Sequence, residues 1–188
     1  MSEQPPSDYG QAPPPPPPPA PGVPRPGELL DRFLARLIDG VLLAVVNGII
    51  VSALIVGVLM GTSVGFGGYG TGASYAAGLV SAVLTTVIYL GYFGYMESSR
   101  GQTVGKMLMK LKTTGPDGQN PTMEQAIRRN IFMGFGILGV IPILGGLIGG
   151  LASLVAVIMI AVGINNDTVN RQAWHDHFAG ETRVWKVG

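Results

Sequence analysis

The chain has 188 residues, of which 47% are hydrophobic and only 12% charged, and its mean hydropathy is positive at +0.38. These values are unusual for a soluble domain and favour a membrane protein. A net charge of +1 excludes the strongly basic balance typical of nucleic-acid-binding proteins, and the absence of cysteine excludes disulfides and thiolate chemistry.

Residues 1–26 contain twelve of the fifteen prolines, including the unbroken run from Pro13 to Pro19. Such a segment has almost nothing apolar to bury, so the sequence predicts a disordered tail with a polyproline II stretch. Two functions remain open for this tail. It is either a docking site for a proline-binding protein partner or a solvated spacer.

The first apolar segment is expected to form a helix over about 27–61. Steps of four and seven residues return to nearly the same side of a helix, so Arg32, Arg36 and Asp39 form one polar stripe on its opening turns. Residues 40–61 carry no charge, and 22 residues at a rise of about 1.5 Å extend about 33 Å, enough to cross a bilayer. We therefore expect the two arginines to pair with Asp39 near the membrane boundary.

A glycine-rich connection over 61–72 leads to a second apolar run, predicted as a helix over about 73–96. The loop over 97–130 is rich in lysine and arginine, whereas the connection over 61–72 contains neither. The positive-inside rule then predicts a multipass protein of the plasma membrane with a cytoplasmic N-terminus.

The basic loop has a pattern of its own. Residues 107–113 alternate apolar and basic side chains as a strand does, and residues 182–187 could pair with them as a β-hairpin-like element. Lys106 is expected to anchor this loop on the cytoplasmic side. A helix opening near Pro121 should bring Arg128 and Arg129 to the lipid headgroups.

The apolar segment over 131–164 is too long for one straight crossing and short for two, and Pro142 interrupts it. A long kinked helix and a broken hairpin, with helices over about 121–141 and 143–164, both remain open. Pairing of the two strands requires a cytoplasmic C-terminus, which favours the hairpin.

Together these patterns predict an all-α integral membrane protein. It would be a small bundle of three or four transmembrane or re-entrant helices over 27–188, with a short cytoplasmic β-hairpin-like element and the disordered tail over 1–26.

Motifs for chemistry are weak. The stretch from Gly101 to Lys106 resembles a phosphate loop, but it is one residue short between its glycines. It also lacks the Ser or Thr that follows the lysine in such loops, so we reject a nucleotide site.

The stretch His175-Asp176-His177 has no further ligands at metal-site spacing, and we expect interfacial polar residues there instead of a metal. We expect no enzyme activity, no cofactor and no nucleic-acid partner. Glycine spacings such as Gly145-xxx-Gly149 permit close helix contacts, including those of a homo-oligomer.

Three motifs in order resemble the RDD family of small multipass membrane proteins. They are an arginine seven residues before an aspartate (Arg32 and Asp39), the stretch Thr103-Val104-Gly105-Lys106, and the stretch His175-Asp176-His177-Phe178-Ala179-Gly180. Here Glu181 stands before Thr182, a departure from the family's pattern. The proline-rich head is similar to that of mycobacterial-type proline-rich antigens. The resemblance implies Arg32, Asp39 and Asp176 as the defining polar residues, but no settled activity.

Two classes of function follow. The first is an accessory or scaffold component of the cell envelope, in contact with the lipid bilayer, whose Arg/Asp set holds the fold while the tail recruits partners. The alternative is a small transporter, such as a cation/proton exchanger, with Asp39 as the titrating site; two nearby arginines would keep that carboxylate ionised and disfavour this role. A third, weaker reading is lipid or peptidoglycan-precursor handling through Arg128 and Arg129.

Overall fold

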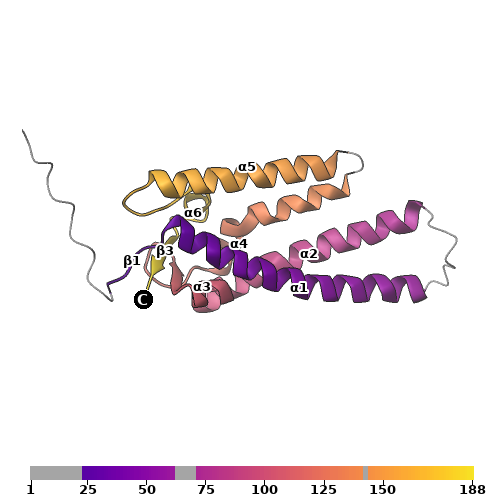
Figure 1. Cartoon of the computed structure of the whole chain (residues 1–188), viewed down its shortest axis with the longest axis horizontal. Coiled ribbons are helices and arrows are strands. Elements are labelled where there is room, and N and C mark those ends of the chain that lie inside the picture. Colours follow the sequence, from indigo (N-terminus) through magenta and orange to yellow (C-terminus); the bar gives the residue numbers. More distant parts are fainter. Residues whose placement is uncertain (1–22, 62–70, 142–143) are drawn as a thin grey trace, which may run out of the picture.

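Three long helices run in one direction away from a small mixed assembly at one end of the protein (Figure 1). The computed structural model describes residues 23–61, 71–141 and 144–188. The long helices are α1 (Leu29–Gly61), α2 (Thr71–Arg100) and α5 (Gly145–Asn166). We call the assembly at their shared end the platform (residues 23–28, 101–130 and 167–188). It contains three short helices, α3 (Val104–Leu108), α4 (Met123–Asn130) and α6 (Trp174–Phe178), and a small sheet.

All three long helices are long and apolar enough to cross a membrane. The qualifying stretches are Leu29–Ala53, Gly78–Arg100 and Gly145–Asn166. Large apolar side chains on each of them face outward instead of into the protein; examples are Val41, Val45 and Ile49 on α1, Val80, Val83 and Val87 on α2, and Leu147, Leu151 and Leu154 on α5. A soluble protein rarely exposes an apolar surface of this extent.

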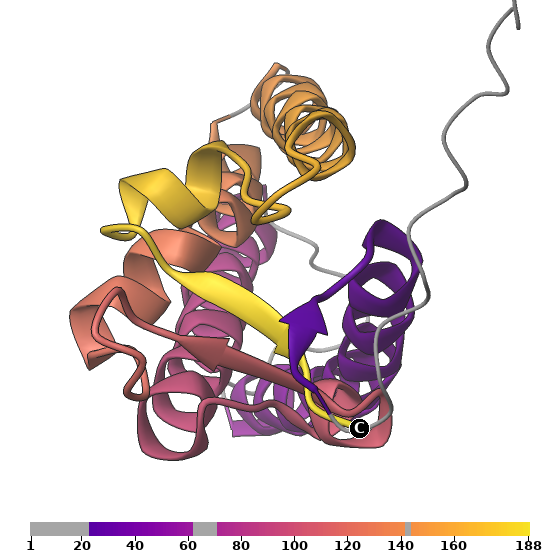
Figure 2. The ribbon, with the colours of Figure 1, turned by 90° about the vertical axis from the view of Figure 1, so that its left-hand side faces the viewer.

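The platform sheet has three strands, in the order β1 (Arg25–Pro26), β3 (Arg183–Lys186) and β2 (Leu111–Thr114). Both pairings are antiparallel, and the sheet lies across the end of the helices (Figure 2). The predicted β element is therefore present, with a third strand contributed by the residues just before α1. This strand corrects the predicted tail boundary, because residues 25–26 are paired; residues 1–22 lie outside the described part of the chain.

The strand predicted over 107–113 begins only at Leu111, because the residues before it form helix α3. The Thr103 side chain accepts a hydrogen bond from the Lys106 amide and caps this helix. Lys110, with a φ of 52°, then turns the chain into β2. Alternation of apolar and basic side chains is compatible with a strand. The Thr103 cap and the packing of residues 104–108 against α1 nevertheless stabilise a helix there.

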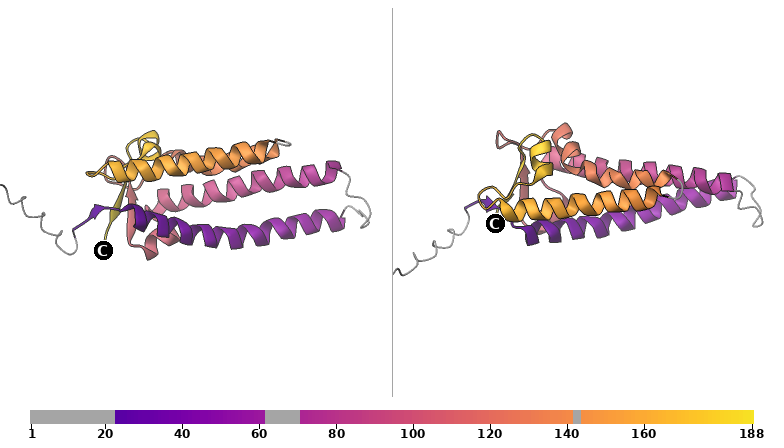
Figure 3. Two further views of the ribbon diagram at one scale, coloured as in Figure 1. Left: turned by 45° about the horizontal axis from the view of Figure 1, so that its top comes forward. Right: turned by 90° about the horizontal axis from the view of Figure 1, so that it is seen from above.

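Residues 131–141 and 144–166 form the two arms of a broken hairpin, one of the two arrangements that the sequence left open. Its first arm is the 3₁₀ helix η1 (Ile131–Val140) and its second arm is α5, which returns to the platform (Figure 3). A Cβ on Gly145 would overlap the carbonyl oxygen of Leu138, and one on Gly149 would lie 2.6 Å from that of Phe135. The Gly145-xxx-Gly149 spacing therefore serves a close contact within this chain. As a result, the C-terminus lies at the same end as β1.

Candidate functional site

Asp39 lies at the joint between α1 and α3 and is only 1% exposed. Its carboxylate accepts hydrogen bonds from the Thr103 hydroxyl (2.5 Å), the Gly105 amide (2.7 Å) and the Tyr92 hydroxyl (2.8 Å). Gly105 is required for this approach, because a Cβ there would overlap the carbonyl oxygen of Ala35. The expected pairing of Asp39 with Arg32 and Arg36 is wrong: all three of its hydrogen-bond donors are uncharged.

Lys106, three residues after Thr103, points instead toward α2 and β2. Its ammonium donates to Glu97 Oε1 and to the Thr113 hydroxyl, both at 2.6 Å. The side chain is 8% exposed and that of Glu97 is fully buried. Lys106, predicted as a cytoplasmic anchor, is therefore buried inside the platform. Burial lowers the pKa of Lys106 to about 7; Glu97 opposes this lowering, and the charges of Arg129 and Arg36 add to it.

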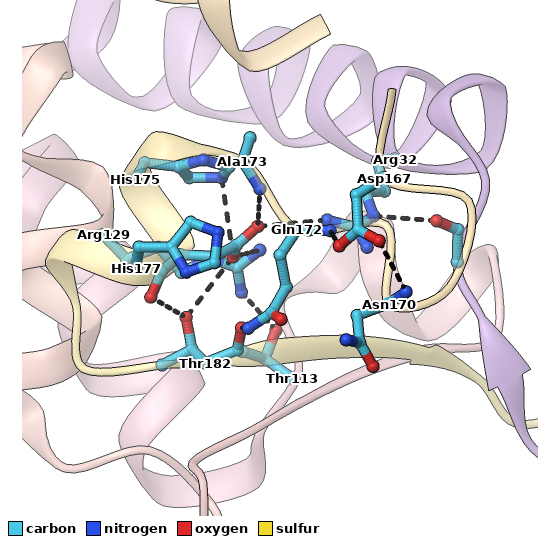
Figure 4. Close-up of polar contacts among 12 residues, drawn as sticks. Arg32, Thr113, Arg129, Asp167, Asn170, Gln172, Ala173, His175, His177 and Thr182 are labelled. Atoms are coloured by element: carbon cyan, nitrogen blue, oxygen red, sulfur yellow. Dashed lines mark hydrogen bonds and ion pairs between the residues drawn. The ribbon is translucent and has the colours of Figure 1, made fainter. Parts of the chain in front are cut away.

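Asp176 of α6 is the second buried aspartate of the platform. One of its oxygens forms an ion pair with Arg129 at 3.0 Å, and the other accepts a hydrogen bond from Arg32 at 3.4 Å. Figure 4 shows Arg32 and Arg129 among the polar residues of this part of the platform. Burial by itself would raise the pKa of this carboxyl, but Arg129, His175 and Arg32 outweigh that effect and lower the pKa to about 2. Asp176 is thus ionised at neutral pH and joins α6 to α1 and α4.

Arg129 connects the Asp176 and Glu97 parts of the site. Besides Asp176, it donates to the Thr113 hydroxyl at 2.9 Å and lies 3.8 Å from Glu97 Oε2. Its side chain is 3% exposed. The placement of Arg129 at lipid headgroups is therefore wrong, whereas Arg128 is exposed and pairs with Glu124.

Arg36 has no carboxylate within ion-pair distance among the described residues. Its guanidinium donates to Asn130 Oδ1 at 2.9 Å and lies 4.2 Å from the ring centroid of Phe93, with Phe132 at 5.9 Å. Aromatic faces attract a guanidinium through the quadrupole of the ring. Arg36 is thus held by an amide and two aromatic rings.

The two histidines of the His-Asp-His stretch differ in their surroundings. His175 is buried, and burial together with the charge of Arg129 lowers its pKa to about 3 despite the nearby Asp176, so the ring is neutral at pH 7. His177 is exposed and contacts Glu181 at 2.9 Å. Across residues 23–61, 71–141 and 144–188, no three His, Asp, Glu or Cys side chains are grouped as metal ligands. The interfacial position expected for this stretch fits His177 but not His175 or Asp176.

These buried groups form a cluster, which we call the charge network. Hydrogen bonds and ion pairs connect its members through Thr103 and Thr113, except that Arg36 interacts with the carboxylates through its charge and donates to Asn130. Its charged members are the cations Arg32, Arg36, Lys106 and Arg129 and the carboxylates Asp39, Glu97 and Asp176. Gly180, with a φ of 82°, makes the turn before β3, and its amide donates to the His177 carbonyl at 2.9 Å.

Sequence reasoning missed five members of this site: Glu97, Asn130, Arg129 as a buried residue, and the hydroxyls of Tyr92 and Thr113. Glu97 had a usable signal, because it ends the second apolar run as a lone acid, much as Asp39 precedes the first uncharged span. The two hydroxyl residues had none, because tyrosine and threonine are common in any helix or strand.

The motif over 103–106 acts as one unit, which we call the clamp. Thr103 and Gly105 bind Asp39 on α1, whereas Lys106 binds Glu97 on α2 and Thr113 on β2. Four consecutive residues thus join two long helices to the platform sheet.

One of the comparisons with known proteins identifies a family. The model of the RDD family matches residues 26–180, which include the clamp, Arg32, Asp39 and Asp176. No curated protein and no solved structure matches the chain, so the comparisons do not support the expected similarity to proline-rich antigens. The chain belongs to the RDD family.

Proposed function

We propose that this protein is a multipass scaffold of the plasma membrane, with the platform on the cytoplasmic side. The three apolar helices and their outward-facing side chains support insertion in the bilayer. Lysine and arginine are concentrated in the platform, and the connection over 62–70 contains none, which supports a cytoplasmic platform by the positive-inside rule.

The observation that carries the scaffold role is the attachment of the proline-rich tail. Its last residues form strand β1, with Arg25 opposite Lys186 and Pro26 opposite Trp185. The Gly27 amide donates to the Val184 carbonyl at 2.8 Å. A tail that only tethered a helix would not need pairing with the C-terminal strand. The attachment instead holds the tail at a defined point on the platform, where it can present its polyproline segment to a cytoplasmic partner.

Cross-linking and affinity capture from intact cells test this role. The full chain is compared with a variant lacking residues 2–22, which keeps β1, and with a variant in which an equally long Gly/Ser run replaces Pro13 to Pro19. We expect partners that are retained by the full chain and lost from both variants, since a Gly/Ser coil does not form the preformed polyproline helix. An identical set of partners for all three proteins would refute recruitment by the tail.

The alternative of a transporter using Asp39 is less well supported by the geometry. A proton or cation carrier must release its ligand, but Asp39 is held by three donors from two different elements. We expect Asp39→Asn to weaken the joint between α1 and α3. Ion flux in proteoliposomes that is present for the wild type and abolished by Asp39→Asn, with the folded bundle retained, would favour the transporter over the scaffold.

A further inference from the structure

The charge network carries more positive than negative charge. Its four cations face three carboxylates, and His175 adds no charge at neutral pH. An unbalanced charge away from water is costly, so the network should give up a proton wherever one can be released. Protonating a carboxylate would only increase the imbalance.

Lys106 is the one cation of the network with this capacity. The other three are arginines, whose guanidinium groups keep their proton in proteins. The two neighbours of the Lys106 Nζ atom also suit a neutral amine. Glu97 can still accept one of its N–H groups, and the Thr113 hydroxyl, which accepts from Nζ at 2.6 Å, can rotate and donate to the lone pair instead.

Groups on four other elements face this amine. They are Arg36 on α1, Glu97 on α2, Thr113 on β2 and Arg129 on α4. Asp39 of α1 contacts the same short helix through Thr103 and Gly105. Arg129 donates to the same hydroxyl as Lys106, so the two cations share one acceptor. When one of the two cations loses its charge, the Thr113 hydroxyl no longer has to accept from both. Only Lys106 can lose its proton.

We propose that Lys106 is a buried proton-binding site, the one cation of the charge network that releases its proton, and that its neutral form makes the clamp more stable. This site is independent of the role proposed for the tail. Because the clamp joins α1, α2 and β2, uptake of a proton at Lys106 acts on all three elements at once.

The direction of the pH dependence follows from linkage. Burial lowers the pKa of Lys106 from 10.5 to about 7, so between these two values the unfolded chain binds a proton that the folded protein does not. The free energy of unfolding should therefore rise with pH from about 7 toward 10. Below about pH 7 both states are protonated and this contribution no longer changes.

Nitrogen-15 NMR of the lysine side chains in the full chain, held in detergent or nanodiscs, tests the site directly. The chain has four lysines, so the spectrum is simple, and Lys106→Arg assigns the signal by removing it. We expect one Nζ signal to change from ammonium to amine between about pH 6 and 8, whereas an ordinary lysine stays an ammonium in that range. Four signals that all remain ammonium up to about pH 9 would overturn the proposal.

Unfolding midpoints provide a second, independent readout. The wild type should become more stable between about pH 7 and 9, whereas Lys106→Met, which is neutral at every pH, should lack this increase. Lys112→Met, on the partly exposed lysine of β2, is the matched control and should keep it. An equal pH dependence in the wild type and Lys106→Met would contradict the inference.

Discussion

At the residue scale, the contacts of the two aspartates differ in kind. Asp39 is held by neutral donors whose positions are set by α3 and α2, whereas Asp176 is held by the cations Arg32 and Arg129. The neutral donors reach Asp39 only because the backbones of α1 and α3 lie close together, so an added side chain at that contact should disrupt them. The ion pairs of Asp176 require both partners, so removing either the carboxylate or an arginine leaves a buried charge without a counter-charge.

Gly105→Ala should therefore destabilise the protein. The added Cβ would overlap the Ala35 carbonyl and lie 3.0 Å from the Asp39 carboxyl carbon, so α3 must move away from α1. Overpacking of this kind costs about 1–3 kcal/mol or more. Gly40→Ala on α1 is the control, since nothing lies within 4 Å of its Cβ, and it should not destabilise. Equal unfolding midpoints for the two variants would contradict the close approach at Gly105.

Asp176→Asn should cost about 3–5 kcal/mol at neutral pH, because it leaves Arg32 and Arg129 buried without their shared carboxylate. The folded pKa of Asp176, about 2, is below its usual value of 3.8, so its contribution is complete above about pH 4 and declines as the pH falls toward 2. Unfolding measured from about pH 5 to 2 should show the difference between wild type and variant shrinking. Glu181→Gln, in an exposed pair with His177, is the control and should change stability by less than about 1 kcal/mol.

At the element scale, short helices carry much of the site. Helix α4 has eight residues, too few to be stable alone, and it delivers Arg129 and Asn130 to the charge network. Its start is defined by a capping box in which Thr122 and Gln125 exchange side-chain and backbone hydrogen bonds. This local signal fixes where α4 begins. It thereby also fixes the direction of the Arg129 side chain about two helical turns later.

Thr122→Ala should cost about 1 kcal/mol, because the Gln125 amide loses its acceptor at the helix start. The effect can be read from unfolding midpoints in detergent. Thr168→Ala, an exposed threonine in the loop after α5, removes the same atoms outside any cap and should be close to neutral. A loss as large for Thr168→Ala would show that the cap is not what stabilises α4.

At the scale of the whole molecule, the hairpin of η1 and α5 brings the C-terminal strand back to the residues before α1. The sheet pairing of β1, β3 and β2 and the ion pair of Lys186 with Asp31 at 2.9 Å then close the platform. Both ends of the described chain thus lie on one side of the bundle, a requirement for Asp176 to meet Arg32.

Single-cysteine labelling tests this orientation, since the chain has no cysteine of its own. Asp117→Cys and Phe178→Cys, both on exposed platform residues, should react with a membrane-impermeant reagent only after the cytoplasmic side is opened. Ser63→Cys, in the connection between α1 and α2, should react in intact cells. Labelling of all three from the same side would refute the proposed membrane orientation.

The sequence by itself determined the apolar segments, their approximate limits and the presence of polar residues before and between them, because long uncharged runs have few alternatives to a helix. It also singled out Arg32, Asp39, the clamp motif and Asp176, all of which lie in the charge network or the clamp. The sequence did not predict which of these residues contact one another. Helical spacing favoured Arg32 and Arg36 as partners of Asp39, but in the tertiary structure Asp39 binds the clamp and Arg32 binds Asp176. Spacing along one helix describes only neighbours on that helix, whereas the donors of Asp39 lie 53 to 66 residues away. Only the return of the η1–α5 hairpin and the close approach at Gly105 bring these groups together.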